Sequence, residues 1–184
     1  MNLKSKPRCR FVNNNPLYIK YHDEEWGREV TDRKALFEYL CLELFQSGLS
    51  FECVLNKREN LRNAFFSFDP DLVSKMTLKD VESLLLNPGI IRHKAKILVV
   101  INNAKIFLKI ETEFTSFYHY LLSFTKGKRL DEPYNLHTQN ALSTTLAQDL
   151  KSRGMKYLGT KTIYSYLQAI GIINPHEEQC YLYH

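Results

Sequence analysis

The sequence of 184 residues lacks most of the patterns that mark exported, membrane-spanning or zinc-finger proteins. No apolar run is long enough to span a bilayer, and the longest, such as 97–101, have the length of core segments. Basic residues near the N-terminus are followed by no apolar run, so we expect no signal peptide. The four cysteines include no Cys-x-x-Cys pair, which is a common spacing in zinc fingers. These absences favour a cytoplasmic protein with reduced thiols.

Alternating apolar and polar residues, the pattern of a half-buried strand, are missing as well, and no segment repeats. Apolar residues instead recur at helical spacing along nearly the whole chain. With 44% hydrophobic and 24% charged residues, the composition is that of a globular protein long enough to bury a core. The net charge of +5 permits a polyanionic partner. We therefore predict an all-α fold and a single compact unit over residues 1–184.

Start and stop signals divide the chain into helices. Asp32 precedes a helix that ends at Gly48, and Ser50 caps a second helix whose apolar face extends to Phe65. The polar stretch 126–137 is expected to form a long loop. Further helices are expected in chain order at 77–87, 92–108, 114–124, 141–153 and 160–169.

Two cysteines and two histidines at opposite ends of the chain form a candidate metal site. Cys9 and His22 bracket a loop-like stretch, whereas His176 and Cys180 are four residues apart, which puts both on one side of a helical turn. These residue types suit a closed tetrahedral zinc site, although about 150 residues separate the two pairs. Packed cysteines and surface histidines are the alternative. A shared ion would require a fold that brings the two termini together.

The segment 78–108 predicts two helices joined by a turn at Pro88 and Gly89. A glycine turn and the helix N-terminus after it present unsatisfied N–H donors, which suit a phosphate. Such contacts hold a nucleic-acid backbone without reading its sequence. An ordinary hairpin with a solvated basic face is the alternative. Four side chains at the start of the second helix would add positive charge: Arg92, His93, Lys94 and Lys96.

Glu43 is the polar residue whose position is hardest to explain, because its helical spacing from Leu40 puts it on or beside the apolar face. A carboxylate there must find hydrogen-bond donors or have its pKa raised. Aromatic residues of nearby segments, Tyr21, Trp26 and Phe51, suit stacking on a nucleobase, and a carboxylate can accept from an exocyclic amine. The alternative is a glutamate paired with a basic neighbour among ordinary core aromatics.

Four blocks of the sequence, spread from about Cys9 to Cys180, are similar to one enzyme family. They are PLYIKYHDEEWG, LCLELFQSGLSFECVLNKRENLRNAF, NPGIIRHKAKI and KSRGMKYLGTKTIYSYLQAIGIINPHEEQC. In this order they resemble the 3-methyladenine DNA glycosylase I family. The resemblance implies a helix-hairpin-helix glycosylase fold with a zinc-clasped lobe formed by segments 9–22 and 176–180. It also implies hydrolysis of the N-glycosidic bond of 3-methyladenine in alkylated DNA, which leaves an abasic site.

The resemblance assigns roles at the matching positions. The structural zinc ligands of the family fall on Cys9, His22, His176 and Cys180. The base-reading glutamate falls on Glu43 and the catalytic pocket tyrosine on Tyr21. Trp26 is retained in the pocket, while Phe11 and Phe51 stand where the family has tryptophan. These two changes shrink the stacking surface but keep an aromatic face.

The resemblance further implies a monomeric enzyme that acts on double-stranded DNA containing alkylated adenine and needs no membrane. Gly89, Arg92, His93 and Lys94 are its expected contacts with the DNA backbone. No lysine is placed for a Schiff base, so we expect a monofunctional glycosylase. The main alternative is a non-catalytic binder of damaged DNA or modified bases on the same scaffold. A catalytic zinc hydrolase is disfavoured because four protein ligands leave no open position, and a helical interaction module predicts no affinity for DNA.

Overall fold

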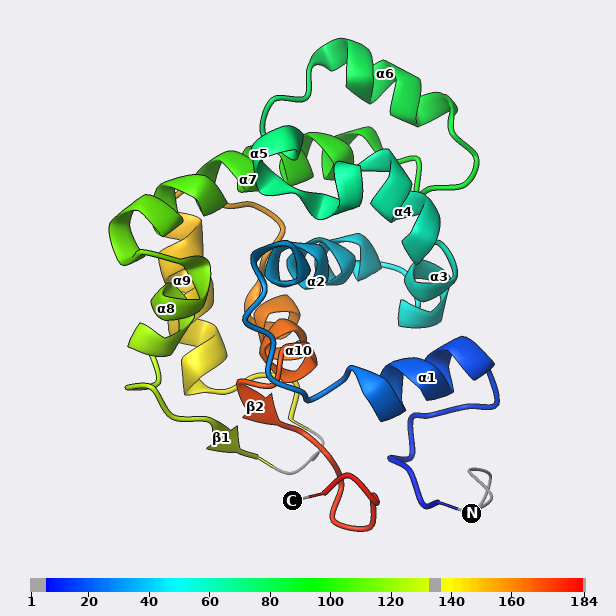
Figure 1. The fold of residues 1–184 in the computed structure, drawn as a ribbon, viewed down its shortest axis with the longest axis vertical. Helices are drawn as coiled ribbons and strands as arrows, with labels where there is room; N and C mark the ends of the chain where they lie inside the picture. The colour runs from blue at the N-terminus through cyan, green and yellow to red at the C-terminus, as the bar shows by residue number, and fades with distance from the viewer. Residues whose placement is uncertain (1–5, 133–136, 184) are drawn as a thin grey trace.

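The computed structural model describes residues 6–132 and 137–183 and is mostly helical, which confirms the predicted class. Two strands of two residues each, β1 (Leu130–Asp131) and β2 (Ile173–Asn174), pair in parallel and are the exception within these ranges. The helical elements labelled in Figure 1, together with one 3-10 turn, η2, are α1 (Pro16–Glu24), α2 (Arg33–Gln46), α3 (Phe51–Asn56), α4 (Arg58–Ala64), η2 (Phe66–Phe68), α5 (Pro70–Val73), α6 (Leu78–Leu86), α7 (Lys94–Phe114), α8 (Phe117–Ser123), α9 (Ala141–Ser152) and α10 (Thr160–Ala169).

Helix α2 forms the centre of the molecule, with α7 and α5 on one side and α10 on the other (Figure 1). Every residue from Leu36 to Phe45 is buried, so most of α2 has no solvent-facing side. Two carboxylates are therefore carried into the interior. Glu38 is neutralised there by Arg58 of α4, with 2.5 Å between Oε1 and Nε. The other carboxylate is Glu43, whose predicted burial is confirmed.

Both ends of α2 are capped. At the N-terminus Oδ1 of Asp32 accepts a hydrogen bond from the Ala35 amide at 2.8 Å, as the sequence predicts. At the C-terminus Nζ of Lys96 donates to the carbonyl oxygens of Phe45, at 2.9 Å, and Ser47, at 2.5 Å. The expectation that Lys96 adds charge to a phosphate site is therefore wrong. Its side chain is drawn inward because the last carbonyls of a helix lack donors and carry the negative end of the dipole.

Helix α1 lies where the sequence suggests a loop. Asn15 caps it by accepting a hydrogen bond from the Leu17 amide at 2.9 Å, and Pro16 occupies the first helical position. His22 is consequently on a helix, and Tyr21 precedes it on the same turn. One helix thus carries a candidate metal ligand and a candidate pocket residue side by side.

Other boundaries also differ from those expected. The helix predicted from Ser50 is interrupted at Lys57, whose backbone (φ −102°, ψ 1°) separates α3 from α4. Residues 66–68 all have positive φ and form a left-handed turn, although none of them is a glycine. Helix α7 starts at Lys94 and continues beyond the predicted end at Leu108. The predicted loop 126–137 contains β1, and its residues 133–136 lie outside the described ranges.

The N- and C-terminal segments lie together at one end of the molecule (Figure 1). The Tyr181 amide donates to the Pro7 carbonyl at 2.9 Å, which ties the two segments directly. Within residues 6–132 and 137–183, no helix combines the length and apolarity needed to cross a bilayer. That residues 1–184 form a single compact unit stays a prediction.

Candidate active site and metal centre

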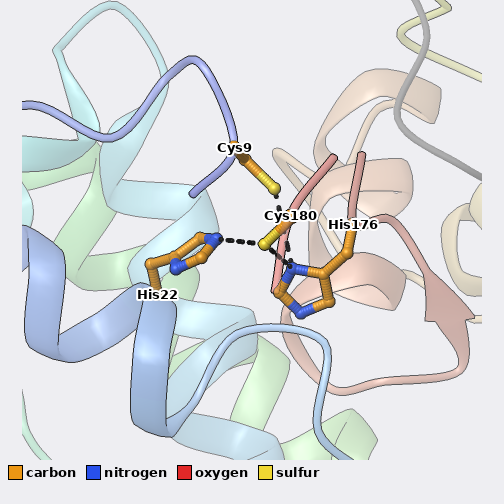
Figure 2. A group of neighbouring side chains, drawn as sticks. All are labelled: Cys9, His22, His176 and Cys180. Carbon is orange, nitrogen blue, oxygen red and sulfur yellow. Dashed lines mark hydrogen bonds between the residues drawn. The ribbon is translucent and has the colours of Figure 1, made fainter. Parts of the chain in front are cut away.

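Four side chains from the two terminal segments form one buried cluster: Cys9, His22, His176 and Cys180 (Figure 2). Their potential ligand atoms all lie within 4.8 Å of one another. Sγ of Cys180 lies 3.6 Å from Nε2 of His22 and 3.6 Å from Nδ1 of His176. Sγ of Cys9 lies 3.6 Å from the same Nδ1. The structure therefore brings together two residue pairs that are far apart in the sequence.

The spacing of these atoms fits a tetrahedral metal ion. Bonds of about 2.3 Å to sulfur and about 2.0 to 2.1 Å to nitrogen, the lengths that zinc makes, put sulfur and nitrogen about 3.5 to 3.6 Å apart at the tetrahedral angle. The three sulfur–nitrogen distances of 3.6 Å in the cluster fall within that range. Four protein ligands fill such a coordination sphere, so an ion here would link segments of the chain and would bind no substrate.

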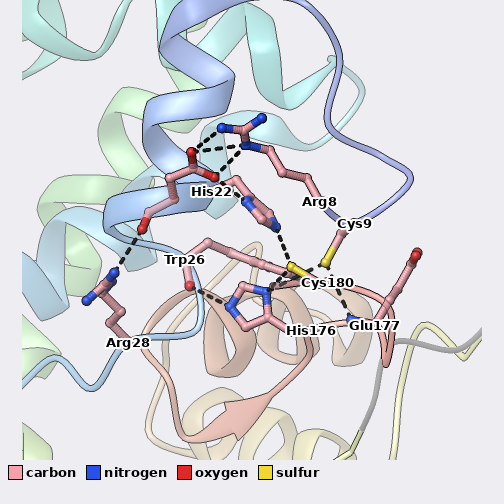
Figure 3. Close-up of polar contacts among 9 residues, drawn as sticks. Arg8, Cys9, His22, Trp26, Arg28, His176, Glu177 and Cys180 are labelled. Carbon is pink, nitrogen blue, oxygen red and sulfur yellow. Dashed lines mark hydrogen bonds and ion pairs between the residues drawn. The ribbon is translucent and has the colours of Figure 1, made fainter. Parts of the chain in front are cut away.

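Both imidazoles are held through their second ring nitrogen (Figure 3). Nδ1 of His22 lies 2.9 Å from Oδ1 of Asp23, and Nε2 of His176 lies 3.2 Å from the carbonyl oxygen of Trp26. These nitrogens donate, which leaves the lone pair of the other nitrogen free for a metal. Arg8 holds the Asp23 carboxylate in turn, with 2.6 Å between Nη2 and Oδ2. The cluster thus has the outer layer of hydrogen bonds that is typical of metal sites.

His176 and Cys180 achieve their four-residue spacing in a turn outside any helix, which the Cys180 amide closes by donating to the Glu177 carbonyl at 2.8 Å. The Glu177 amide points at Sγ of Cys9, 3.4 Å away. Burial raises the pKa of Cys9 to about 12 and lowers the pKa of His22. Burial alone therefore favours the neutral forms, and the Cys9 thiolate needs a cation beside it.

The histidines of the cluster pack against two aromatic side chains, Trp26 and Phe11. The ring of Trp26 lies against both histidines, with centroid distances of 5.8 Å to His22 and 4.9 Å to His176. Phe11 lies edge-on to Trp26 at 4.7 Å. Gly27 has a φ of +75°, and a Cβ there would be 2.9 Å from Nε2 of His176. This close approach fixes Trp26 relative to the candidate ligand beside it.

Beside this cluster lies a cavity of about 140 Å³, which we call the aromatic cavity. Every pocket side chain predicted from the sequence contributes to its wall: Phe11, Tyr21, Trp26, Glu43 and Phe51. The remaining lining residues are Tyr18, Gln46, Ser165 and Gln168, so no lysine or arginine is among them. Flat rings together with one carboxylate form a site suited to a planar, electron-poor or cationic ligand.

Glu43 is the one acidic residue of this wall, and it is 6% exposed. No hydrogen bond or ion pair reaches its carboxylate from any residue in the described ranges. Burial raises the pKa of Glu43 to about 8. Burial and, next, the nearby Glu43 charge raise the pKa of Tyr21 well above its usual value, so its phenol stays protonated. The pocket therefore offers a carboxyl group that lacks a partner and a hydroxyl that can donate.

A second cavity, of about 190 Å³, adjoins the first and is called the α10 cavity. The two share Glu43, Gln46 and Ser165. Lys161 and Thr162, from the first turn of α10, complete its wall together with Ser47. Glu43 thus stands between an aromatic compartment and one that contains a positive charge.

A family model described as methyladenine glycosylase matches residues 11–184. The chain belongs to the methyladenine glycosylase family. It is 44% identical over 183 residues to DNA-3-methyladenine glycosylase 1 of Escherichia coli (strain K12), which covers 96% of each chain. A crystal structure of 3-methyladenine DNA glycosylase I matches with a TM-score of 0.92 at 43% identity, over 97% of this chain and 100% of the other. The enzyme from Staphylococcus aureus, solved to explain its recognition of 3-methyladenine, has a TM-score of 0.92 at 37% identity, over 96% of each chain.

In this member of the methyladenine glycosylase family, the predicted DNA-backbone residues lie in the turn between α6 and α7 and at the first position of α7. Arg92, His93 and Lys94 are exposed, and Gly89 is half-buried. The His93 side chain turns back and accepts from the Lys96 amide at 3.3 Å, so one donor of the α7 N-terminus is already satisfied. The positions are accessible to DNA, and their role stays a prediction.

Sequence reasoning missed several lining residues of the two cavities. Tyr18 and Gln46 adjoin predicted residues on α1 and α2, and Ser165 and Gln168 come from α10. The signal in the sequence is weak: polar residues three apart, within an otherwise apolar helix face, point toward a shared cavity. Only the packing of α10 against α2 shows which cavity they reach.

Proposed function

We propose that this protein is a DNA repair glycosylase that hydrolyses the N-glycosidic bond of 3-methyladenine in alkylated double-stranded DNA. The observation that carries the proposal is the unpartnered, 6% exposed carboxyl of Glu43 in the wall of an aromatic cavity. Membership of the methyladenine glycosylase family supports the same conclusion. A buried acid without donors is costly unless a ligand supplies them.

The aromatic residues would hold a base that has been extruded from the duplex. Extrusion costs a few kcal/mol of stacking and pairing and is easiest at a damaged base. Trp26, Phe51 and Phe11 provide ring faces and edges for a purine, and their phenyl and indole groups exclude water from it. Tyr21, kept protonated by its environment, can donate a hydrogen bond to the base.

Glu43 would recognise the lesion through its charge. A 3-methyladenine still attached to DNA is cationic, and a positive charge next to Glu43 favours the ionised carboxylate. The group thus accepts hydrogen bonds from the adenine edge while it balances the charge of the base. Neutral adenine gives no such gain, because it leaves the carboxylate without a counter-charge in a buried site.

Bond cleavage then needs little acid catalysis. The bond between C1′ and the base nitrogen breaks, its electron pair neutralises the positive base, and a water oxygen bonds to C1′ and releases a proton. Free 3-methyladenine and an abasic sugar are the products, with the DNA strand intact. We propose no lysine nucleophile, in keeping with a monofunctional hydrolase.

We further propose that the Cys9, His22, His176 and Cys180 cluster holds one structural zinc ion per chain. Support comes from the sulfur–nitrogen distances of 3.6 Å and from hydrogen bonds that fix both imidazoles. When bound, the ion would balance the charge of the two thiolates. The four residues would then tie the N-terminal segment to the C-terminal tail. Cys41 and Cys53 are free thiols too, consistent with a reducing, cytoplasmic setting.

The exposed turn between α6 and α7 would contact the DNA backbone through Gly89, Arg92, His93 and Lys94, with the protein acting as a monomer. The side chains of Arg92 and Lys94 carry positive charge, so this face presents positive charge to the phosphates. The contacts would position the duplex, and the cavity would select the lesion.

Release of free 3-methyladenine from methylated DNA, with the product identified by mass, tests the proposal. Wild type should release it, and Glu43→Gln should lower kcat/KM by about 100-fold, since a hydrogen bond to a charged group is lost. Glu82→Gln, at an exposed position of α6, should match wild type. Binding of methylated DNA without any base release would identify a non-catalytic binder instead. Equal release by Glu43→Gln and wild type would remove Glu43 from the mechanism.

A further inference from the structure

Arg58 of α4 joins two carboxylates that come from different helices. Its Nη1 donates to Oε2 of Glu25, at the end of α1, with a distance of 2.6 Å. Its Nε donates to Oε1 of Glu38 on α2, with a distance of 2.5 Å. Arg58 is 7% exposed, so little water competes for these hydrogen bonds. Because a planar guanidinium has donors in fixed directions, Arg58 fixes the end of α1 relative to α2.

Tyr39 of α2 makes the same connection directly. Its hydroxyl donates to Oε2 of Glu25 at 2.6 Å, the oxygen that also accepts from Arg58. The guanidinium carbon of Arg58 lies over the Tyr39 ring, 5.3 Å from its centroid. Burial and, next, the bond to Glu25 raise the pKa of Tyr39, so the hydroxyl keeps the proton that it donates. Three side chains from α1, α2 and α4 thus form one unit, which we call the α1 clamp: Glu25, Tyr39 and Arg58.

The α1 clamp lies next to Tyr21. The Glu25 amide donates to the Tyr21 carbonyl at 3.0 Å, so Glu25 follows Tyr21 by one helical turn. The rings of Tyr39 and Tyr21 have a centroid distance of 6.5 Å. Tyr39 also precedes Glu43 by four residues on α2, which puts the two on the same side of that helix. The α1 clamp therefore connects the turn of α1 that carries Tyr21 with the turn of α2 that carries Glu43.

The distance between these two turns matters because Tyr21 and Glu43 line the same cavity from different helices. A base between them must meet both groups at hydrogen-bonding distance, and hydrogen bonds weaken steeply when their geometry is poor. Phe51 packs against the Tyr21 ring, with a centroid distance of 4.9 Å, but an apolar contact of this kind has no fixed direction. The described lining of the aromatic cavity includes no member of the α1 clamp, so any effect of the clamp on a base must pass through a neighbour.

We propose that Glu25, Tyr39 and Arg58 are positioning residues, which hold the hydroxyl of Tyr21 where it meets the base that Glu43 binds. This role rests on the proposed glycosylase function, because the position of the hydroxyl matters only when a base enters the cavity. The α1 clamp acts through Tyr21 and does not contact the base. It sets the separation of α1 and α2 beside the cavity, so its loss weakens the hydrogen bond that Tyr21 donates.

The test begins with Arg58→Lys, which keeps the positive charge but cannot present a planar fork to two carboxylates. It should lower kcat/KM for release of 3-methyladenine from methylated DNA about tenfold, the effect of one hydrogen bond. Arg62→Lys is the matched control, because Arg62 also donates to Glu38 while its other acceptor is Glu59 instead of Glu25. The control should stay within about twofold of wild type.

Coupling to Tyr21 separates positioning from a general loss of structure. Arg58→Lys is combined with Tyr21→Phe, and the rate of base release is measured again. Without the Tyr21 hydroxyl, Arg58→Lys should lower kcat/KM by less than about twofold, since positioning and positioned group act as one. An equal loss in both backgrounds, or no loss in either, would overturn the positioning role. Should Arg58→Lys not fold, the same cycle with Tyr39→Phe decides, because that change keeps the ring and removes only the bond to Glu25.

Affinity for free 3-methyladenine, measured by calorimetric titration, separates this role from the proposed function. Binding of the free base requires no bond cleavage, and the same cycle of variants applies to it. Wild type that binds the base but releases none from methylated DNA would overturn the glycosylase function, and coupling in the affinities would then decide the positioning role. Release by wild type without coupling to Tyr21 would overturn the positioning role alone. Wild type that neither binds nor releases the base would overturn both.

Discussion

Among the described residues, buried polar groups have partners in one region of the molecule and lack them in another. The first region is the cluster of Cys9, His22, His176 and Cys180, and the second is the cavity around Glu43. In the cluster each imidazole has a partner on its second nitrogen, and each sulfur has at least one neighbouring imidazole at 3.6 Å. Glu43, about equally buried, has no partner in the described chain. The hydrogen bonds around the cluster orient its side chains for an ion that would tie the two terminal segments together. A single unpartnered acid is incomplete and marks where a ligand belongs.

The two regions nevertheless share a wall. Trp26 and Phe11 contact the histidine rings on one side and line the aromatic cavity on the other. His22 also follows Tyr21 directly on α1. Loss of order in the cluster should therefore also disturb the side chains of the cavity, whereas substitutions at Glu43 should leave the structure of the cluster unchanged. This asymmetry can be tested.

Removal of the metal should have the largest effect. A ligand present at about 1,000 times its Kd stabilises the folded state by about 4 kcal/mol, so a zinc chelator should lower the free energy of unfolding by at least that order. Cys180→Ser should have a similar effect and should make the protein insensitive to chelator. Metal content by elemental analysis and denaturant unfolding measure both. Base affinity should fall as well, because Trp26 loses its support.

Cys53→Ser is the matched control, since Cys53 is half-buried and lies outside the cluster. It should retain about one zinc per chain and respond to chelator like wild type. Zinc-free wild-type protein with unchanged stability would contradict the structural role of the cluster.

Glu43→Gln should stabilise the protein at neutral pH while it impairs base release. Burial raises the pKa of Glu43 in the folded state to about 8, well above the value near 4.5 of an exposed glutamate, so the fold favours the protonated carboxyl. Below pH 4 wild type and variant should be equally stable. As pH rises from 4.5 towards 8, wild type should lose stability relative to the variant, by about 3 kcal/mol at pH 7. Urea unfolding of both proteins across this range measures the difference.

The difference between the two proteins is the informative quantity, because histidine and cysteine titrations affect both equally. Glu82→Gln, at an exposed site, should change the free energy of unfolding by less than about 0.5 kcal/mol. A difference between Glu43→Gln and wild type that stayed flat from pH 4 to pH 8 would mean that Glu43 has a partner in solution.

Lys96→Met tests a buried charge that does have partners. Its Nζ satisfies the carbonyls of Phe45 and Ser47, so the change leaves two buried acceptors unpaired and should cost about 2 kcal/mol in the free energy of unfolding. Lys94→Met, two residues earlier and exposed, should cost less than about 0.5 kcal/mol. In DNA binding the order should reverse, with Lys94→Met the more affected in its salt dependence. Equal loss of stability in the two variants would contradict the capping role.

The parts of this molecule that local patterns control were predictable. The cap at Asp32 and the reciprocal hydrogen bonds of Thr77 with Asp80 follow from their sequence positions, and helical spacing alone placed Glu43 among buried residues. The four metal ligands could be proposed as one candidate site from residue type, and family resemblance assigned the same four residues. Each of these predictions depends on residues that are close together in the sequence or on motifs that can be recognised as short stretches of sequence.

The parts that depend on distant contacts were not predictable. From the sequence alone, Lys96 is expected on the surface. Its acceptors, the carbonyls of Phe45 and Ser47, are about fifty residues away along the chain and reach it only because α2 packs beside α7. The left-handed turn at 66–68 contains no glycine from which it could have been predicted. Ser165 enters the pocket only because α10 packs on α2, a tertiary contact that periodicity cannot specify.

Phe51→Leu should have the smallest effect and tests whether the ring itself is used. Leucine keeps apolar bulk but removes the face that stacks, so affinity for free 3-methyladenine should fall about fivefold, equivalent to about 1 kcal/mol. Stability should change little, because Phe51 is only half-buried beside Tyr21. Phe66→Leu, at an exposed phenylalanine outside the cavity, is the control, and calorimetric titration with the free base measures both. If the two variants bound equally well, Phe51 would be part of the packing around Tyr21, and recognition would depend on Glu43 and Trp26.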